Sequence, residues 1–267
     1  MPVTGTTRVV VHLTYPAKHL RTPSLFNPLL ERLGHDGVLV PWEVSPDNLA
    51  SAWAGLRGIE NLAGVIVTVP HKIEVAHLCD ELLGTAEMLK VCNVARRLPD
   101  GRFVGRMFDG EGYVRGLKNQ GHDLAGRRVL LLGAGGAATG IAHALLSEPI
   151  TRLVVANRSL AKAEALAEQL RTLMPGRDIA AGAADARGFD VVINATALGL
   201  KADDPLPLAA DTLQPGTLVG EVVMNPDVTP LLEAAQARGC PIHKGVHMLT
   251  GQLELLADYL FGAAPGR

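Results

Sequence analysis

The sequence predicts an α/β protein with two domains, and three observations support this prediction. Short apolar or β-branched runs alternate with helix-forming runs along the 267 residues, which is typical of sheets covered by helices. The alternation stops at residues 108–112 and starts again near residue 128, which indicates a second domain. Just after this restart, an apolar run at 129–132 leads into a glycine turn and a helix-forming run at 137–146.

The composition excludes several classes of protein. The chain is 48% apolar and 19% charged, as expected of a globular protein with a sizeable core. A formal net charge of −2 without a long basic run gives no reason to expect nucleic-acid binding. No apolar stretch is long enough to span a bilayer, and no secretory signal pattern is visible at the N-terminus. We therefore expect a cytoplasmic protein without a membrane partner.

The cysteines and histidines predict no metal site. Cys79, Cys92 and Cys240 are odd in number and widely spaced, so neither a zinc site nor a disulfide framework is expected. His243 and His247 are four residues apart, but Gly245 lies between them. Reduced thiols and no bound metal are the expectation.

The first 120 residues are expected to form one α/β layer. The expected strands are residues 8–13, 38–42, 63–69, 88–97 and 102–107. The expected helices are residues 23–33, 47–56, 74–83 and 113–120. Gly101 can take a positive φ in the turn that joins the last two strands.

The second half of the chain repeats the alternation. Its expected strands are residues 129–132, 153–156, 190–194, 218–224 and 241–243. Its expected helices are residues 137–146, a long alanine-rich helix to 173, one from Pro230 to 239, and 248–261. Thr229 is the expected N-cap before Pro230.

The glycine turn after residue 132 predicts a Rossmann-type dinucleotide site. Gly133 allows the sharp turn, and Gly135 leaves room for a pyrophosphate against the backbone. Small Ala138 stands where the helix must pack tightly on the strand. The helix N-terminus then offers free N–H groups and the positive end of a dipole to the phosphates.

The residues after the next strand favour NADP over NAD. NAD-binding units usually carry an acidic residue there, which bonds the ribose 2′-hydroxyl. This chain instead has Asn157, Arg158 and Ser159, with Lys162 one turn later. A guanidinium suits phosphate geometry, so we expect Arg158 to pair with a 2′-phosphate. An ordinary solvated arginine at a strand end is the alternative.

Two polar residues follow strand ends in the first domain, where ligands of open α/β sheets bind. Lys72 follows Thr68-Val69-Pro70-His71, and Asp109 follows Arg106-Met107-Phe108. A lysine and an aspartate that meet in a cleft make a proton-transfer pair. A structural ion pair is the alternative, and the spacing alone favours it.

Several motifs together resemble those of the shikimate/quinate dehydrogenase family over nearly the whole chain. The family's N-V-T-x-P-x-K, G-A-V-N-T and N-T-D-G-x-G motifs have counterparts at residues 66–72, 90–94 and 107–112. Its cofactor loops and N-A-T-x-x-G segment have counterparts at 133–137, 157–159 and 194–199, and its last two motifs at 225–232 and 245–252.

The resemblance implies a substrate-binding and catalytic domain at residues 1–112, an NADP-binding Rossmann domain at 113–245, and a C-terminal helix, 246–267, that returns to the first domain. It implies reversible hydride transfer between NADP and a ring hydroxyl or ketone of shikimate or a shikimate-like cyclic hydroxy acid, by a monomer or homodimer. The family's pattern places cofactor contacts at Gly133, Ala134, Gly135, Gly136, Ala137, Asn157, Arg158, Ser159, Lys162, Thr196, Gly245 and Met248.

The resemblance also assigns roles at the substrate. Lys72 acts on the hydroxyl proton with support from Asp109, and Thr68, Asn93 and Gln252 hydrogen-bond the substrate hydroxyls. An unperturbed lysine has a pKa of about 10.4. A lysine base near neutral pH needs desolvation, whereas a charged lysine stabilises an alkoxide, and both roles stay open.

The chain departs from the family where the substrate carboxylate binds. The family's S-x-S before a proline is here Leu20-Arg21-Thr22, so that one hydroxyl is lost and Thr22 keeps the other. Ile66 replaces an asparagine, and further changes fall at Met107, Phe108, Glu221 and Met224. We therefore expect hydride chemistry on an altered substrate, with Arg21 or His19 as a replacement acid-binding group.

Two alternatives remain open. One is an ordinary biosynthetic shikimate dehydrogenase of aromatic amino acid biosynthesis, which reduces 3-dehydroshikimate. The other is a non-catalytic NADPH-binding regulator, against which the retained Lys72 and Asp109 argue.

Overall fold

The chain forms two compact units. The computed structural model describes residues 2–18, 20–201 and 203–262. One unit comprises Met1–Phe108 with Gln252–Arg267, and the other comprises Asp109–Gly251. The expected boundaries followed residues 112 and 245. They differ because α5 (Asp109–Asn119) already begins where the sequence pattern breaks, and because the second boundary falls inside α9 (Val246–Phe261).

The first unit is built on a six-stranded mixed sheet. Its strands are β1 (Arg8–Thr14), β2 (Gly37–Glu43), β3 (Leu62–Val67), β4 (Glu81–Leu82), β5 (Val94–Arg97) and β6 (Phe103–Arg106). Their order is β2-β1-β3-β5-β6-β4. β1 is parallel to β2 and β3, whereas β5 is antiparallel to both β3 and β6. The carboxyl ends of β1, β3 and β6 therefore lie at one edge.

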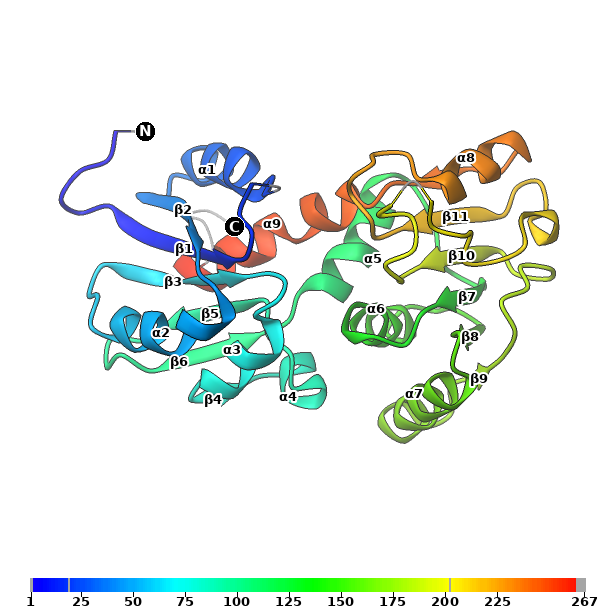
Figure 1. Ribbon diagram of the computed structural model, residues 1–267, viewed down its shortest axis with the longest axis horizontal. Coiled ribbons are helices and arrows are strands. Elements are labelled where there is room, and N and C mark those ends of the chain that lie inside the picture. The colour runs from blue at the N-terminus through cyan, green and yellow to red at the C-terminus, as the bar shows by residue number, and fades with distance from the viewer. Residues whose placement is uncertain (1, 19, 202, 263–267) are drawn as a thin grey trace. The chain divides into compact units, whose positions relative to one another are not determined.

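Helices cover both faces of this sheet (Figure 1). The helices are α1 (Thr22–Arg32), α2 (Leu49–Arg57), α3 (Lys72–Leu78) and α4 (Thr85–Leu89), with a short 3-10 turn at Pro46–Asn48 before α2. Trp53 of α2 and Val75 of α3 share one buried cluster with Val11 and Leu13 of β1. On the opposite face a Cβ at Gly64 of β3 would meet Leu260 of α9.

Two expected elements of the first unit are wrong. The helix expected at 74–83 begins at Lys72 and ends at Leu78, and strand β4 follows it. The strand expected at 88–97 begins only at Val94, because residues 85–89 form α4. Long-range bonds explain the early helix end. Asp80 accepts from the Phe103 amide at 2.7 Å and from Arg57 Nη1 at 2.8 Å, so tertiary contacts override local propensity.

The second unit is a six-stranded sheet in which every pair is parallel. Its strands are β7 (Arg128–Leu132), β8 (Arg152–Ala156), β9 (Ile179–Ala181), β10 (Val191–Asn194), β11 (Leu218–Glu221) and β12 (Ile242–His243). The order β12-β11-β10-β7-β8-β9 is that of a dinucleotide-binding sheet, with its switch point between β7 and β10. β9 was not expected, and β11 ends at Glu221 rather than at residue 224.

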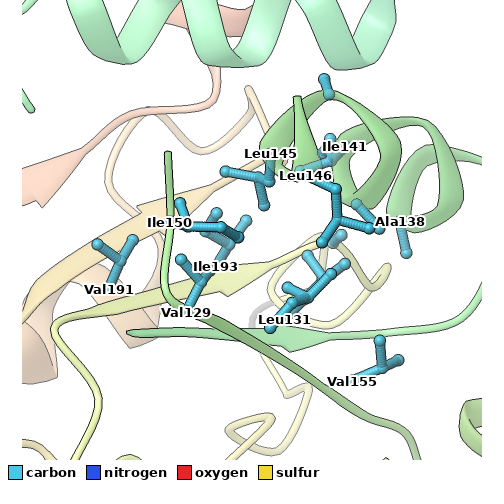
Figure 2. Packing of buried hydrophobic residues seen from close by; sticks show 14 of the residues in the cluster. Val129, Leu131, Ala138, Ile141, Leu145, Leu146, Ile150, Val155, Val191 and Ile193 are labelled. Atoms are coloured by element: carbon cyan, nitrogen blue, oxygen red, sulfur yellow. The ribbon is translucent and has the colours of Figure 1, made fainter. Parts of the chain in front are cut away.

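Both faces of this sheet are covered, as parallel sheets require. The helices are α5, α6 (Gly136–Leu146), α7 (Leu160–Leu173), α8 (Pro230–Ala237) and the first turns of α9, with a 3-10 turn at Ala210–Thr212. Figure 2 shows Val129, Leu131 and Ile193 of the sheet packed with Ile141 and Leu145 of α6. The other face packs Leu130, Leu132 and Val192 against Leu231 and Leu232 of α8.

Candidate functional site

The glycine turn of the second unit has the conformation that a nucleotide loop requires. Gly133 has a φ of +116°, and a Cβ there would meet Ala195 O at 2.9 Å. Its amide donates to Ala156 O at 2.8 Å, which fixes the turn to β8. Gly135 is the N-cap of α6, is exposed, and would place a Cβ in open space. The first amides of α6 are thus open to an anion.

A cavity of about 510 Å³ opens at the carboxyl edge of β7, β8 and β10. It is lined by Leu132, Gly133, Ala156, Asn157, Arg158, Ala184, Thr196, Ala197, Leu198, Leu206 and Pro207. Four expected cofactor residues, Gly133, Asn157, Arg158 and Thr196, are among them. Leu198, Leu206 and Pro207 give it an apolar wall suited to a flat ring. This wall was not expected from the sequence, because its residues lie in loops without a periodic pattern.

Two basic residues lie in the turn after β8 and at the start of α7. Arg158 and Lys162 are exposed, and the Lys162 amide donates to Ser159 O at the start of α7. Asn157 Nδ2 donates to Ser159 O at 3.0 Å, which holds this turn. No acidic residue lines the cavity. The residues present therefore fit a nucleotide with a phosphate on its ribose.

Other expected cofactor residues lie outside the cavity wall. Ala134, Gly136 and Ala137 belong to the turn and the first residues of α6. Gly245 is buried, and a Cβ there would overlap Val223 O. Met248 is half-buried and packs against the core under α6. The structure thus gives Gly245 and Met248 packing roles, and their contact with a cofactor stays a prediction.

A buried carboxylate for which the sequence predicts no role supports the cavity wall. Glu221 is fully buried and accepts from Asn194 Nδ2 and from Thr229 Oγ1, each at 3.0 Å. Asn194 Oδ1 in turn accepts from the Thr196 amide and hydroxyl. Burial raises the pKa of the Glu221 carboxyl, although hydrogen bonds from Asn194, Val223, Thr229 and Val222 oppose the shift. Glu221 therefore holds the loop that carries Thr196.

Expected substrate residues of the first unit gather at the carboxyl edge of its sheet. The Thr68 amide donates to Leu13 O at 3.0 Å, just beyond β3. Buried His71 bonds Val44 O at 2.7 Å through Nε2, which anchors the start of α3. Lys72 is the first residue of α3, and its carbonyl accepts from the Cys92 amide at 3.0 Å. The Lys72 backbone is thus held from two sides.

Asn93 and Gln252 meet in this unit although 159 residues separate them in the sequence. Asn93 Nδ2 donates to Gln252 Oε1 at 2.9 Å, and Asn93 Oδ1 accepts from the Phe108 amide at 2.9 Å. Both side chains are buried. The amide pair joins the start of β5 to α9 and places two hydrogen-bonding groups together.

The expected acid-binding residues differ in their placement. Thr22 is buried in the first turn of α1, whereas Arg21 is the exposed N-cap residue without a side-chain capping bond. His19 lies outside the described residues. Arg21 is thus accessible to a solvent-borne anion, while Thr22 is positioned by the fold.

Lys72 and Asp109 belong to different units. Asp109 is the first residue of α5 in the second unit and is 3% exposed. A carboxylate at a helix N-terminus is favoured by the helix dipole. The pairing of these two residues stays a prediction.

Two absences hold for the described parts of the chain. Within residues 2–18, 20–201 and 203–262, no helix has the length and apolar character needed to cross a bilayer. Over those same residues, no three or more His, Cys, Asp or Glu side chains are placed to hold a metal ion.

Comparison with known families gives two matches that together span most of the chain. Residues 13–95 match the shikimate dehydrogenase substrate-binding domain, and residues 116–200 match shikimate/quinate 5-dehydrogenase. A similar relative is the shikimate dehydrogenase (NADP+) of Geobacter metallireducens. It is 35% identical over 273 residues, covering 99% of this chain and 95% of the relative.

Solved structures of related enzymes superpose on nearly the whole chain. A shikimate dehydrogenase in complex with NADP+ superposes with a TM-score of 0.88 at 27% identity, covering 99% of this chain and 93% of that one. The ligand-free 5-ketofructose reductase of Gluconobacter sp. strain CHM43 superposes with a TM-score of 0.84 at 27% identity, covering 97% and 94%.

Proposed function

The chain belongs to the shikimate/quinate dehydrogenase family, and on that premise we propose that it is an NADP-dependent dehydrogenase with an altered substrate. The reaction is hydride transfer between NADP(H) and a hydroxyl or ketone of a shikimate-like cyclic hydroxy compound. The observation that carries the proposal is the cavity beside the glycine turn. Arg158 lines this cavity, and no acidic residue does.

The second unit holds the cofactor. The open amides at the start of α6 would hold the pyrophosphate, and Arg158 would hold the 2′-phosphate. Leu198, Leu206 and Pro207 supply the apolar wall for the base. This site would supply the hydride acceptor for oxidation as NADP and the hydride donor for reduction as NADPH. Glu221 and Asn194 keep Thr196 in place at this cavity.

The first unit holds the substrate. Thr68, Asn93 and Gln252 hydrogen-bond its hydroxyls at the edge of the sheet. Lys72 takes the hydroxyl proton in oxidation and returns it in reduction, and Asp109 supports the lysine. The polar groups at this edge then hold the reacting carbon in a fixed orientation. Holding the reactants in the correct geometry lowers the entropic part of the activation barrier.

The altered substrate is proposed because hydroxyl and amide groups are missing where the family binds a carboxylate. Leu20 and Ile66 offer apolar surface in place of hydrogen-bond donors. A site built to bond a polar group typically discriminates by orders of magnitude against a partner that lacks it. The likeness to a 5-ketofructose reductase supports a substrate range that includes molecules without a carboxylate.

A substrate panel tests the proposal. Shikimate, quinate and aminoshikimate would be assayed with NADP and with NAD, and 5-ketofructose with NADPH. We expect NADP to be preferred and shikimate to be turned over poorly. Robust turnover at micromolar shikimate would instead establish an ordinary biosynthetic shikimate dehydrogenase.

Lys72→Met separates an enzyme from a regulator. We expect kcat to fall at least a hundredfold, while the Kd for NADPH, measured by fluorescence titration, stays unchanged. Lys118→Met is the matched control, because Lys118 is an exposed lysine paired with Glu148 at 2.7 Å. NADPH binding by a wild type that turns over no substrate of the panel would support the non-catalytic regulator, whereas undiminished rates in Lys72→Met would remove the catalytic role given to Lys72.

A further inference from the structure

His12 is a polar residue inside β1 that the proposed mechanism does not use. In register it lies opposite Ile66 of β3 and Pro41 of β2. Its neighbours Val11 and Leu13 point into the cluster under α2 and α3. Because side chains alternate along a strand, His12 and Thr14 face the other side. Thr68 comes two residues after Ile66. The alternation therefore places the Thr68 side chain on the same face of the sheet as that of His12.

The surroundings of His12 leave its Nδ1 atom without a hydrogen-bond partner. The side chain is 2% exposed, and Nδ1 is buried with no hydrogen bond. An unsatisfied buried polar group costs about 1–3 kcal/mol, and native structures usually avoid it. Since Nδ1 is sealed, a ligand that reaches this ring meets Nε2. Packing alone therefore does not explain a histidine at this position.

The charge state of His12 follows from its position. Burial, and secondarily the positive charge of Lys72, lower the pKa of the imidazole to about 4. At neutral pH the ring is uncharged, so Nε2 donates or accepts one hydrogen bond depending on the tautomer.

We propose that His12 is a substrate-binding residue whose Nε2 hydrogen-bonds an uncharged hydroxyl or carbonyl oxygen of the substrate. The proposal rests on the proposed function, because it needs the substrate to lie at the carboxyl edge of β1 and β3. It deepens that function by naming the class of substrate, a polyhydroxylated ketone or alcohol that carries no carboxylate against β1.

The neighbouring residues favour an uncharged group over a carboxylate. A hydroxyl both donates and accepts, so it satisfies either tautomer of His12, whereas an ionised carboxylate only accepts. The cross-strand neighbour Ile66 is apolar and 5% exposed, so a carboxylate there would lose water without gaining a donor from it. Burying an ionised carboxylate without compensation is strongly unfavourable.

The experiment compares three variants on two probes. His12→Leu removes the hydrogen bond, and His12→Gln keeps an amide near the place of Nε2. His35→Leu is the matched control, because His35 is also buried with an unpartnered nitrogen but stacks on Phe261 at 5.0 Å. The probes are 5-ketofructose with NADPH and shikimate with NADP, together with the Kd for NADPH.

We expect wild-type kcat/KM to be higher for 5-ketofructose than for shikimate. His12→Leu should raise the KM for 5-ketofructose about tenfold, the loss of about one hydrogen bond, with kcat and the Kd for NADPH little changed. His12→Gln should restore most of this loss, and His35→Leu should leave the ratio of the two kcat/KM values unchanged.

Several results would overturn the proposal in distinguishable ways. If His12→Leu leaves the KM and the substrate ratio at wild-type values, if His35→Leu changes them as much as His12→Leu does, or if shikimate is the better wild-type substrate, His12 has no such role while the dehydrogenase function stands. If the wild type turns over neither probe but does turn over quinate or aminoshikimate, the inference fails and the dehydrogenase function stands. If it turns over no substrate of the panel, the proposed function fails as well.

Discussion

Acid should destabilise the second unit through His243, a buried histidine of β12. The side chain is fully buried and its Nε2 has no hydrogen-bond partner. Its Nδ1 lies 3.3 Å from His247 Nδ1, and its ring contacts those of Tyr113 and His122. Burial, then the proximity of His247 and His122, lowers the pKa of His243 from 6.5 to about 3.

The sign of the effect follows from proton binding. Between pH 6.5 and pH 3 the unfolded chain protonates this histidine and the folded chain does not, so stability falls as the pH falls through that window. One pKa unit corresponds to about 1.36 kcal/mol. His243 alone should therefore cost about 2 kcal/mol at pH 5, while above pH 7 its contribution is constant.

Urea unfolding followed by far-UV circular dichroism at pH 7.5 and pH 5 measures the effect. His243→Phe keeps a ring against Tyr113 but has no proton to gain. We expect its free energy of unfolding to drop about 2 kcal/mol less than that of the wild type between the two pH values. His77→Asn is the control, since His77 is exposed on α3 and should keep the wild-type pH dependence.

Equal pH dependence in the wild type and His243→Phe would refute this reasoning. It would mean that His243 is protonated in the folded state at pH 5, and therefore that water or an anion reaches β12. The acid sensitivity contributed by His12, whose pKa is also depressed, is common to both proteins and does not affect the comparison.

Three further predictions concern the cofactor side of the protein. Gly133→Ala should cost about 1–3 kcal/mol, because Gly133 has a φ of +116°, and the loss would be visible as a lowered Tm. Gly135→Ala, in open space, should leave the Tm near the wild-type value. Thr229→Ala removes the N-cap of α8 and a hydrogen bond to Glu221 and should cost about 1–2 kcal/mol in urea unfolding. Arg158→Ser should raise the KM for NADP at least tenfold and leave that for NAD unchanged, in steady-state assays.

The second unit was largely predictable because its signals are local. Each buried parallel strand reads as a continuous apolar run, and the glycine turn follows β7 directly in the sequence. β9 was missed because Ile179–Ala181 is only three residues long and two of its residues are alanines, which are depleted in strands. The residues from Gly133 to Ala137 and from Asn157 to Ser159 are contiguous, so the cofactor loops could be predicted without knowing any long-range pairing.

The first unit was harder because its decisive contacts are long-range. β4 pairs with β6 through Glu81 and Val104, and the two-residue strand has no periodicity of its own. The hydrogen bond between Asn93 and Gln252 depends on where α9 packs, which no short motif encodes. The identity of these two residues could be inferred by resemblance, whereas their direct contact could not.

Polar residues within buried strands carry a signal that motif reading overlooks. The run from Val9 to Leu13 is apolar except at His12, and an apolar run of this kind predicts only a buried strand. Once β1 is placed between β2 and β3, the alternation of side chains assigns His12 to the face of Thr14 and Thr68. Nδ1 of this buried imidazole has no hydrogen-bond partner, which argues against a purely structural role for His12. Strand register, rather than the motif at residues 66–72, therefore identifies His12 as the group that we propose to hydrogen-bond the substrate.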